Sequence, residues 1–174
     1  MSLDKIKQEM EEGPDSETEI FIKDFSLLKD LELYEHINKE LGKKIVGEEL
    51  ARKTIFLTAC MGWVENIKPT SSNLLAESPS GIGKDHVTSS TLDILPKEKV
   101  IKRTRISPTA LTYWKPTKNW EGYILYLEDV SNNVLNSEVM KVMMSGGSYA
   151  TIVVNQVAKD IKIDGKPIII LTTA

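Results

Sequence analysis

The sequence has a single cysteine, Cys60, and only two histidines, His36 and His86, among its 174 residues. One cysteine forms no intrachain disulfide, which favours a reducing compartment, so we expect a cytoplasmic protein. Cysteine and histidine are also too few and too far apart for a structural zinc site. No apolar run is long enough to span a membrane, and the N-terminus lacks the apolar core of a signal peptide. We therefore expect no membrane partner.

Acidic residues are in clear excess only at the N-terminus. Residues 1–19 hold seven acidic residues and two lysines, which leaves the rest of the chain slightly basic against a net charge of −3. That net charge is not typical of a dedicated nucleic-acid binder. The length suits one domain with a substantial core. We expect an acidic N-terminal arm over residues 1–26, interrupted by Gly13-Pro14, and one folded domain over residues 27–174.

Apolar periodicity predicts helices that alternate with strands. Helices are expected over residues 27–41, 48–61, 84–95, 107–114 and 137–144, and strands over 73–76, 100–106, 122–127, 150–157, 161–163 and 167–171. In the second helix we expect Leu50, Ile55 and Leu57 to face inward. Asp164-Gly165 is a hairpin turn signal. The alternation predicts an α/β fold with a parallel sheet that is covered on both faces.

The most informative stretch is Ser78-Pro79-Ser80-Gly81-Ile82-Gly83-Lys84-Asp85, which lies between an expected strand and an expected helix. Glycines in such a turn let the backbone N–H groups approach a phosphate, and the helix N-terminus favours the anion. The lysine adds a mobile positive charge. The stretch therefore predicts a nucleotide site formed by residues 80–85, namely Ser80, Gly81, Ile82, Gly83, Lys84 and Asp85. The alternative is a plain strand-to-helix turn.

Two positions depart from the usual P-loop pattern, which has glycine first and serine or threonine last. Ser78 and Asp85 stand there instead. A hydroxyl at the last position normally binds Mg²⁺. A carboxylate is also a hard oxygen ligand, but it adds negative charge beside the phosphates. Asp85 is thus a candidate metal ligand, a residue that weakens nucleotide binding, or merely a favourable charge at a helix N-terminus.

Polar residues follow two of the expected buried strands. Glu128-Asp129 ends the strand at 122–127, at the sheet edge where α/β proteins bind ligands. Glu128 is a candidate Mg²⁺ ligand, and both carboxylates are candidates to orient or activate an attacking water. Thr172-Thr173 follows the last apolar strand, and Thr173 is a third candidate catalytic residue. Solvated strand ends are the alternative for both pairs.

A basic and aromatic stretch follows the third helix. Seven lysines and arginines between residues 97 and 118 face one acidic residue, Glu98, with Tyr113, Trp114 and Trp120 nearby. Such a stretch suits phosphate contacts and base stacking by nucleic acid. A solvated strand face with partly buried aromatics is the other interpretation, and the more frequent one for such runs.

In the order of these motifs the chain resembles AAA+ P-loop ATPases over roughly residues 40–174. Ser78–Asp85 is similar to a Walker A motif, and Ile124–Asp129 to a Walker B motif with the acidic pair reversed. Ile45-Val46-Gly47 resembles the segment near the adenine, and Ile168–Thr173 the strand that carries a sensor residue. The resemblance implies a three-layer AAA+ fold, ATP and Mg²⁺ as cofactors, and a homo-oligomeric ring in the complete protein.

The segment at about 150–165 resembles the hairpin that precedes the sensor strand in minichromosome-maintenance and superfamily III viral or plasmid helicases. In those rings the hairpin contacts DNA, which implies DNA as a partner and Lys159 and Lys162 as contacts. The chain stops at the sensor strand, which implies a core that is incomplete at its C-terminus. We therefore expect an ATP-binding core of a helicase-like or primase-helicase-like ATPase, with weak or no turnover. The alternatives are a non-catalytic binding module on a decayed P-loop scaffold and a metabolic P-loop kinase.

Overall fold

The computed structural model describes residues 30–64, 73–114, 117, 119–145, 149–154, 157–162 and 164–173. The chain divides into two compact units between residues 40 and 41. In the first unit the carboxylate of Asp30 accepts a hydrogen bond from the Glu32 N–H (2.9 Å) shortly before helix α3 (Leu33–Gly42). This helix begins later than expected. The acidic arm and its boundary at residue 26 lie outside the described residues.

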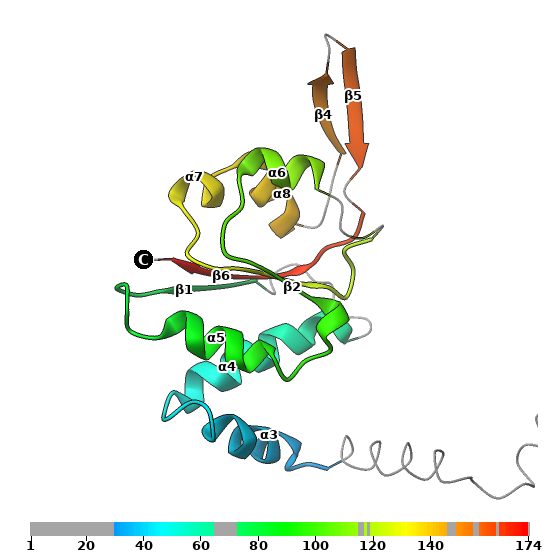
Figure 1. Cartoon of the computed structure of the whole chain (residues 1–174). Helices are drawn as coiled ribbons and strands as arrows, with labels where there is room; N and C mark the ends of the chain where they lie inside the picture. Colours follow the sequence, from blue (N-terminus) through cyan, green and yellow to red (C-terminus); the bar gives the residue numbers. More distant parts are fainter. Residues whose placement is uncertain are drawn as a thin grey trace, which may run out of the picture. The chain divides into compact units, whose positions relative to one another are not determined.

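The second unit contains a parallel sheet of four strands in the order β1 (Asn73–Glu77), β6 (Ile168–Thr173), β3 (Ile124–Leu127) and β2 (Val100–Arg103). Figure 1 shows α4 (Glu49–Cys60) and α5 (Lys84–Leu92) on one face, and α6 (Pro108–Tyr113), α7 (Asn132–Leu135) and α8 (Glu138–Ser145) on the other. A short 3₁₀ helix, η1 (Met61–Trp63), follows α4, and another, η2 (Lys97–Lys99), precedes β2. The expected α/β fold with a parallel sheet covered on both faces is confirmed.

The two central strands, β3 and β6, are buried along their whole length. Their side chains alternate between two apolar clusters. Ile124, Tyr126 and Ile170 pack with residues of α4 and α5, whereas Leu125 and Leu171 pack with residues of α6, α7 and α8. Successive side chains on a strand point to opposite faces. The same alternation therefore determines which polar residue at the end of a strand faces α5.

The inward face of α4 differs from the expectation. Leu50 and Leu57 are 79% and 49% exposed, and the buried residues are Arg52, Ile55 and Ala59. The helix contacts α5, β1 and β6 through a narrow stripe at spacings of three and four residues, which a small residue such as Ala59 allows. Arg52 reaches back to donate a hydrogen bond to the Ile45 carbonyl (3.2 Å). The expected inward orientation of Leu50 and Leu57 was therefore wrong.

A β-hairpin separates α8 from β6. Strands β4 (Tyr149–Val154) and β5 (Val157–Lys162) pair antiparallel, and Figure 1 shows them projecting from the layered part of this unit. The hairpin insertion is thus present. Asp164-Gly165, however, does not join paired strands, because β6 leaves the hairpin and enters the parallel sheet between β1 and β3. The apolar run of β6 is buried on both faces there, which pairing with the polar β5 would not permit.

The Asp164-Gly165 turn docks against the segment that precedes β3. The Asp164 carbonyl accepts a hydrogen bond from the Trp120 N–H (2.8 Å). Gly165 has φ +73°, and a Cβ there would lie 1.9 Å from Asn119 Oδ1 and 2.6 Å from the Glu121 nitrogen. Only glycine satisfies both the backbone conformation and the close approach.

We predict that Gly165→Ala lowers the free energy of unfolding more than Gly47→Ala does. Gly47 has nearly the same φ, +74°, but a Cβ there meets nothing within 4 Å. The control variant thus carries only the cost of a left-handed alanine, about 1 kcal/mol, whereas Gly165→Ala adds a backbone clash of about 1–3 kcal/mol. Urea titration measures both losses, and equal losses would contradict the docking of this turn.

Candidate functional site

The loop between β1 and α5 contains two glycines in the left-handed region. Gly81 and Gly83 have φ +86° and +89°, and Gly83 directly precedes α5. A Cβ at either glycine would meet nothing within 4 Å, so the backbone conformation alone requires glycine. The N-cap residue of α5, Gly83, has no side chain, and no side-chain cap is present among the described residues. The N–H groups of its first turn are therefore open to an anion.

The side chains of this loop are available to a ligand. Ser80, Gly81 and Ile82 are exposed. Lys84 is half-buried, and within the described part of the chain its ammonium group has no hydrogen bond or ion pair. The hydroxyl of Ser78 is buried and has no partner among the described residues. A buried hydroxyl without a protein partner in this loop fits a site that takes a polar ligand.

Asp85 is held by the sheet rather than exposed to solvent. Its Oδ1 accepts a hydrogen bond of 2.5 Å from the Thr172 hydroxyl and a longer one of 3.4 Å from the Tyr126 hydroxyl. The Thr172 hydroxyl in turn accepts a hydrogen bond from the Asp129 N–H (3.1 Å). Thr172 thereby links the first turn of α5 to the turn that follows β3. Three segments far apart in the sequence meet at this one side chain.

Tyr126 lies beneath this network and remains a hydrogen-bond donor. Burial raises the pKa of its phenol well above the usual value, and the charges of Asp85 and Glu128 raise it further, while its contact with Thr172 lowers it. The ordinary pKa of a phenol is about 10, so a phenol whose pKa is raised further stays protonated near neutral pH. The Tyr126 hydroxyl therefore donates to Asp85 and does not act as a base.

Glu128 and Asp129 occupy the carboxyl end of β3, as expected. The Glu128 carboxylate accepts a hydrogen bond from the Thr104 hydroxyl (3.1 Å), and its N–H donates to the Arg103 carbonyl (2.9 Å). Asp129 has φ +48°, one of two described non-glycine residues in the left-handed region. Aspartate tolerates this conformation better than most residues, and the turn leaves its carboxylate exposed.

The Thr173 hydroxyl points to the other face of the sheet. It is buried and donates a hydrogen bond to the Val130 carbonyl (3.0 Å). The sequence marks Thr173 as the candidate catalytic residue of this pair, whereas Thr172 is the threonine whose hydroxyl contacts Asp85. The alternation along β6 places Thr172 with Ile170 on the α5 face. The sequence alone does not show which face of the sheet α5 covers, so it could not distinguish the two threonines.

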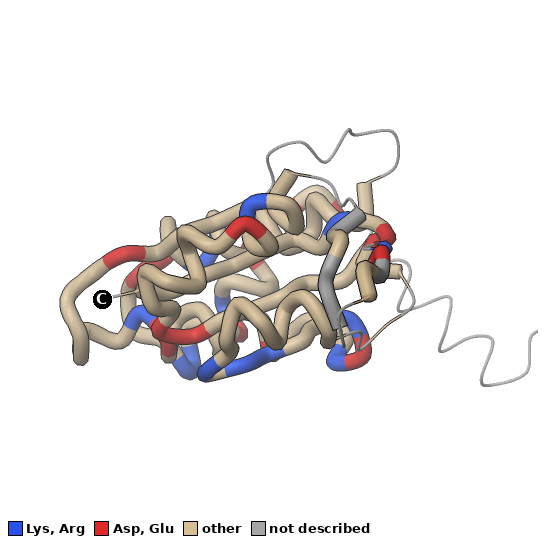
Figure 2. Tube along the Cα trace, turned by 90° about the horizontal axis from the view of Figure 1, so that it is seen from above, with Lys and Arg blue, Asp and Glu red and all other residues tan. Residues whose placement is uncertain are grey.

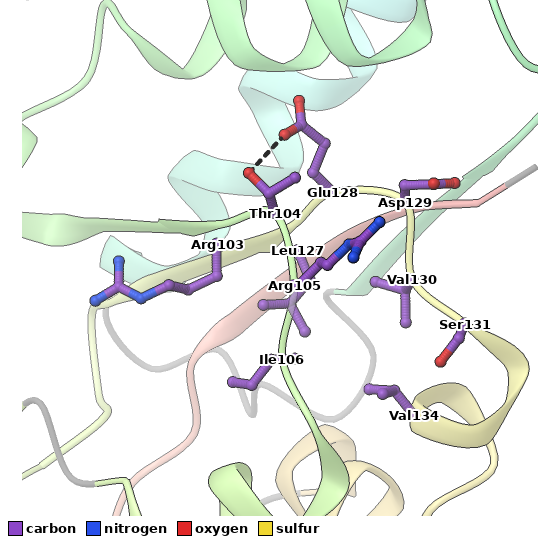
Figure 3. Close-up of a pocket in the computed structure, with 10 residues that line it drawn as sticks. All are labelled: Arg103, Thr104, Arg105, Ile106, Leu127, Glu128, Asp129, Val130, Ser131 and Val134. Carbon is purple, nitrogen blue, oxygen red and sulfur yellow. Dashed lines mark hydrogen bonds between the residues drawn. The ribbon is translucent and has the colours of Figure 1, made fainter.

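A pocket of about 340 Å³ opens beside Glu128 and Asp129. It lies between the β2–α6 loop and the β3–α7 turn, along the edge of the sheet where Figure 2 shows a run of basic residues. Figure 3 shows Arg105 reaching from the loop toward the turn that carries Asp129, and the Thr104–Glu128 hydrogen bond on the other side. None of the residues of the glycine-rich loop lines this pocket.

The hairpin holds the two residues expected to contact DNA. Lys162 is exposed and forms an ion pair of 2.5 Å with Asp164. Lys159 lies opposite Ile152 in the β4–β5 register, and its side chain is outside the described part of the structure. Nothing in these contacts tests DNA binding, so both remain predictions.

A model of the MTBMA_p00010 P-loop domain matches residues 25–174. The chain belongs to this P-loop domain family. No curated protein matches the sequence. P-loop domains generally bind nucleotide with Mg²⁺, and the loop at Ser78–Asp85 supplies the corresponding turn. No described helix is long and apolar enough to cross a membrane.

The residues at the loop fit a nucleotide-bound Mg²⁺ better than a metal held by protein alone. Among the described residues, no three histidine, cysteine or acidic side chains converge as a metal site. Mg²⁺ in P-loop sites keeps several waters and is held by phosphates with one or two protein oxygens. Asp85 and Glu128 offer hard carboxylate oxygens, and the orphaned Ser78 hydroxyl lies at the start of the loop. The oxygen donors and open N–H groups therefore suit Mg²⁺ bound with phosphates.

We predict that Thr172→Val lowers the free energy of unfolding by about 1–3 kcal/mol, because it removes the partner of the Asp129 N–H and the shorter of the two hydrogen bonds to the Asp85 carboxylate. Valine keeps the shape and removes only the hydroxyl. Thr172→Ser keeps the hydroxyl and is expected to retain most of the stability. Chemical denaturation of the three proteins measures the difference. A valine variant as stable as wild type would show that the linkage has no energetic weight.

Proposed function

We propose that the chain is the ATP-binding core of a helicase-like, DNA-processing ATPase. The observation that carries this proposal is the position of β6 between β1 and β3. In that position one side chain, Thr172, contacts both Asp85 at the start of α5 and the turn after β3. A residue between a phosphate loop and a carboxylate pair is suited to sense the terminal phosphate, which is the role that the AAA+ resemblance gives to this strand.

Each candidate residue has a role in this proposal. The N–H groups at Gly81–Lys84 and the Lys84 ammonium bind the phosphates. Asp85 and Glu128 hold Mg²⁺, which when bound neutralises charge on the phosphates. The exposed Asp129 carboxylate orients the attacking water. The register of β6 favours Thr172 over Thr173 as the polar residue nearest the phosphates.

Turnover by this chain is expected to be slow. The Thr172 hydrogen bond holds Asp85 where the P-loop pattern has a hydroxyl, so the negative charge of this carboxylate faces the negatively charged phosphates of the nucleotide. Phosphoryl transfer in such ATPases also gains much of its rate from an arginine supplied to the transition state. Assembly of the complete protein into a homo-oligomeric ring is the arrangement by which a neighbouring subunit would supply it.

The second candidate is a non-catalytic nucleic-acid or protein-binding module on a P-loop scaffold. The hydrogen-bonded state of Asp85 favours it, because a carboxylate fixed by Thr172 and Tyr126 serves a structural role without any metal. The two candidates differ in one measurable property. The ATPase core binds nucleotide through Lys84. The module binds its partner but does not bind nucleotide, even at millimolar concentration.

We predict that Lys84→Ala weakens Mg·ATP binding at least about tenfold, which corresponds to the loss of one charge-assisted contact of about 1.5–3 kcal/mol. Titration of a fluorescent ATP analogue measures the affinity. Lys97→Ala is the matched control, because Lys97 is an exposed lysine in η2, before the amino end of β2. Equal affinities of wild type and the Lys84 variant would sink the ATPase proposal.

We predict that Asp85→Asn binds metal-free ATP more tightly than wild type, by about fivefold or more, because a negative charge beside the phosphates is removed. If Asp85 holds Mg²⁺, the same variant gains less affinity from added Mg²⁺ than wild type gains. Asp85→Thr restores the hydroxyl of the P-loop pattern and is expected to keep the Mg²⁺ gain. ATP titrations with Mg²⁺ and with a chelator separate these effects. An unchanged Mg²⁺ gain in the asparagine variant would remove Asp85 from the metal site.

A further inference from the structure

An open groove of about 490 Å³ continues the pocket beside Glu128 and Asp129. It runs from the β2–α6 loop along α6. Its lining includes Arg103, Arg105 and Ile106 from β2 and the loop, and Tyr113 and Trp114 from the C-terminal end of α6. The nucleotide proposal does not use this groove. Its lining belongs to the basic and aromatic stretch at residues 97–118, which the phosphate loop leaves unexplained.

The aromatic end of the groove is held rigidly. Trp114 packs edge-on against the buried Trp120, with ring centroids 5.9 Å apart and planes at 75°. The Arg103 guanidinium lies over the Trp114 ring, 4.7 Å from its centroid, and donates to the Lys102 carbonyl (2.6 Å). Tyr113 is 51% exposed. The groove thus presents a fixed guanidinium plane and an accessible phenol ring, both of which are surfaces on which bases stack.

The other end of the groove is positively charged. Arg105 is exposed and has no hydrogen bond or ion pair within the described residues. None of the described residues that line the outer groove is acidic. Figure 2 shows that this edge of the sheet carries a run of basic residues. An arginine fork without a carboxylate partner, beside an apolar and aromatic wall, matches a ligand that has both phosphates and flat rings.

We propose that this groove binds single-stranded nucleic acid, with a base stacked on Tyr113 and the Arg103 plane and a phosphate held by Arg105. A duplex does not fit the proposal, because its bases are already stacked and their faces are not accessible. The groove is open rather than closed, which suits a passing strand better than a small metabolite enclosed on most sides. The inference rests on the proposed function only for the role of the strand, not for its binding.

The backbone of the same loop connects the groove to the carboxylates. Arg103 accepts the Glu128 N–H through its carbonyl, and Thr104 donates its hydroxyl to the Glu128 carboxylate. A strand held by Arg103 and Arg105 therefore lies against the residues that position Glu128. This arrangement gives the strand a direct route by which to change ATP turnover.

The test measures binding of a fluorescently labelled oligo(dT) of about ten nucleotides, the number in one turn of a DNA duplex. Oligo(U) and a duplex of the same length are further probes. We expect Arg105→Gln to weaken oligo(dT) binding by about fivefold or more and to lower the slope of log affinity against log salt by about one. Tyr113→Leu removes a stacking surface but keeps an apolar side chain, and we expect a loss of about fivefold or more. Similar losses with oligo(U) would extend the site to RNA.

A matched control locates the site. Lys97→Gln removes one exposed charge before the amino end of β2 and is expected to change binding less than twofold. Lys162→Gln removes a charge on the hairpin, where the family resemblance implies a DNA contact, and therefore tests the competing location. Binding that is unaffected by Arg105→Gln and Tyr113→Leu, or that is absent for every single-stranded probe, would overturn the proposal. Far-ultraviolet circular dichroism and unfolding midpoints equal to wild type exclude misfolding of the variants.

The outcome for this groove is separable from that for the nucleotide site. Arg105→Gln is expected to bind the ATP analogue as wild type does, and Lys84→Ala to bind oligo(dT) as wild type does. If wild type and Lys84→Ala bind the ATP analogue equally while the Arg105 and Tyr113 variants still lose affinity for oligo(dT), the groove stands without the ATPase. The reverse pattern leaves the ATPase and removes the groove.

Discussion

The burial of β6 on both faces, between β1 and β3, is the constraint on which the candidate site depends. Ile168, Ile169, Ile170 and Leu171 are almost completely inaccessible to solvent. An apolar strand of this kind gains most when neighbours pair with both of its edges and helices cover both of its faces. Once it occupies the centre, the alternation of side chains directs Thr172 toward α5 and Thr173 toward α7. The hydrogen bond between Thr172 and Asp85 follows from that register.

The hydrogen bond from Thr172 fixes the position of the Asp85 carboxylate at the first turn of α5. A partly buried carboxylate is costly unless its oxygens are hydrogen-bonded, and Thr172 and Tyr126 both donate to one of its oxygens. The raised pKa of Tyr126 keeps that donor protonated. A carboxylate at this position therefore costs little in the free protein. In the proposed nucleotide complex, the phosphates would bring like charges near Asp85, and a divalent cation between them would relieve the repulsion.

Much of the fold was accessible from the sequence because strongly periodic apolar runs and glycine turns are local signals. The Ser107-Pro108 helix start is one example, since the Ser107 hydroxyl accepts from the Ala110 N–H (3.1 Å) as an N-cap does. The failures have non-local causes. The orientation of α4 depends on its contacts with α5 and the sheet, which leave Leu50 and Leu57 exposed. The Asp164-Gly165 turn signal is genuine, but strand pairing in the sheet outweighs it.

The candidate site divides in the same way. The loop at Ser78–Asp85 was recognisable because its spacing is continuous in the sequence. The choice between Thr172 and Thr173, and the partners of Glu128, depend on which strands are neighbours. Neither Thr104 nor Arg103 has a local pattern that marks it as a partner of Glu128, since 24 residues separate Thr104 from it.

The β2–α6 loop contacts both the Glu128 carboxylate and the groove lined by Arg103 and Arg105. Its backbone and Thr104 hold Glu128 from one side, while Arg103 turns its guanidinium away onto Trp114. The loop is short and anchored at both ends, by pairing of β2 with β3 and by the Ser107 cap of α6. Under the proposal for the groove, a ligand held by the arginines would therefore act on Glu128 through few intervening bonds. A ligand in the groove and a nucleotide at the loop would thus act on the same carboxylate from opposite sides, which requires no wider rearrangement of the sheet.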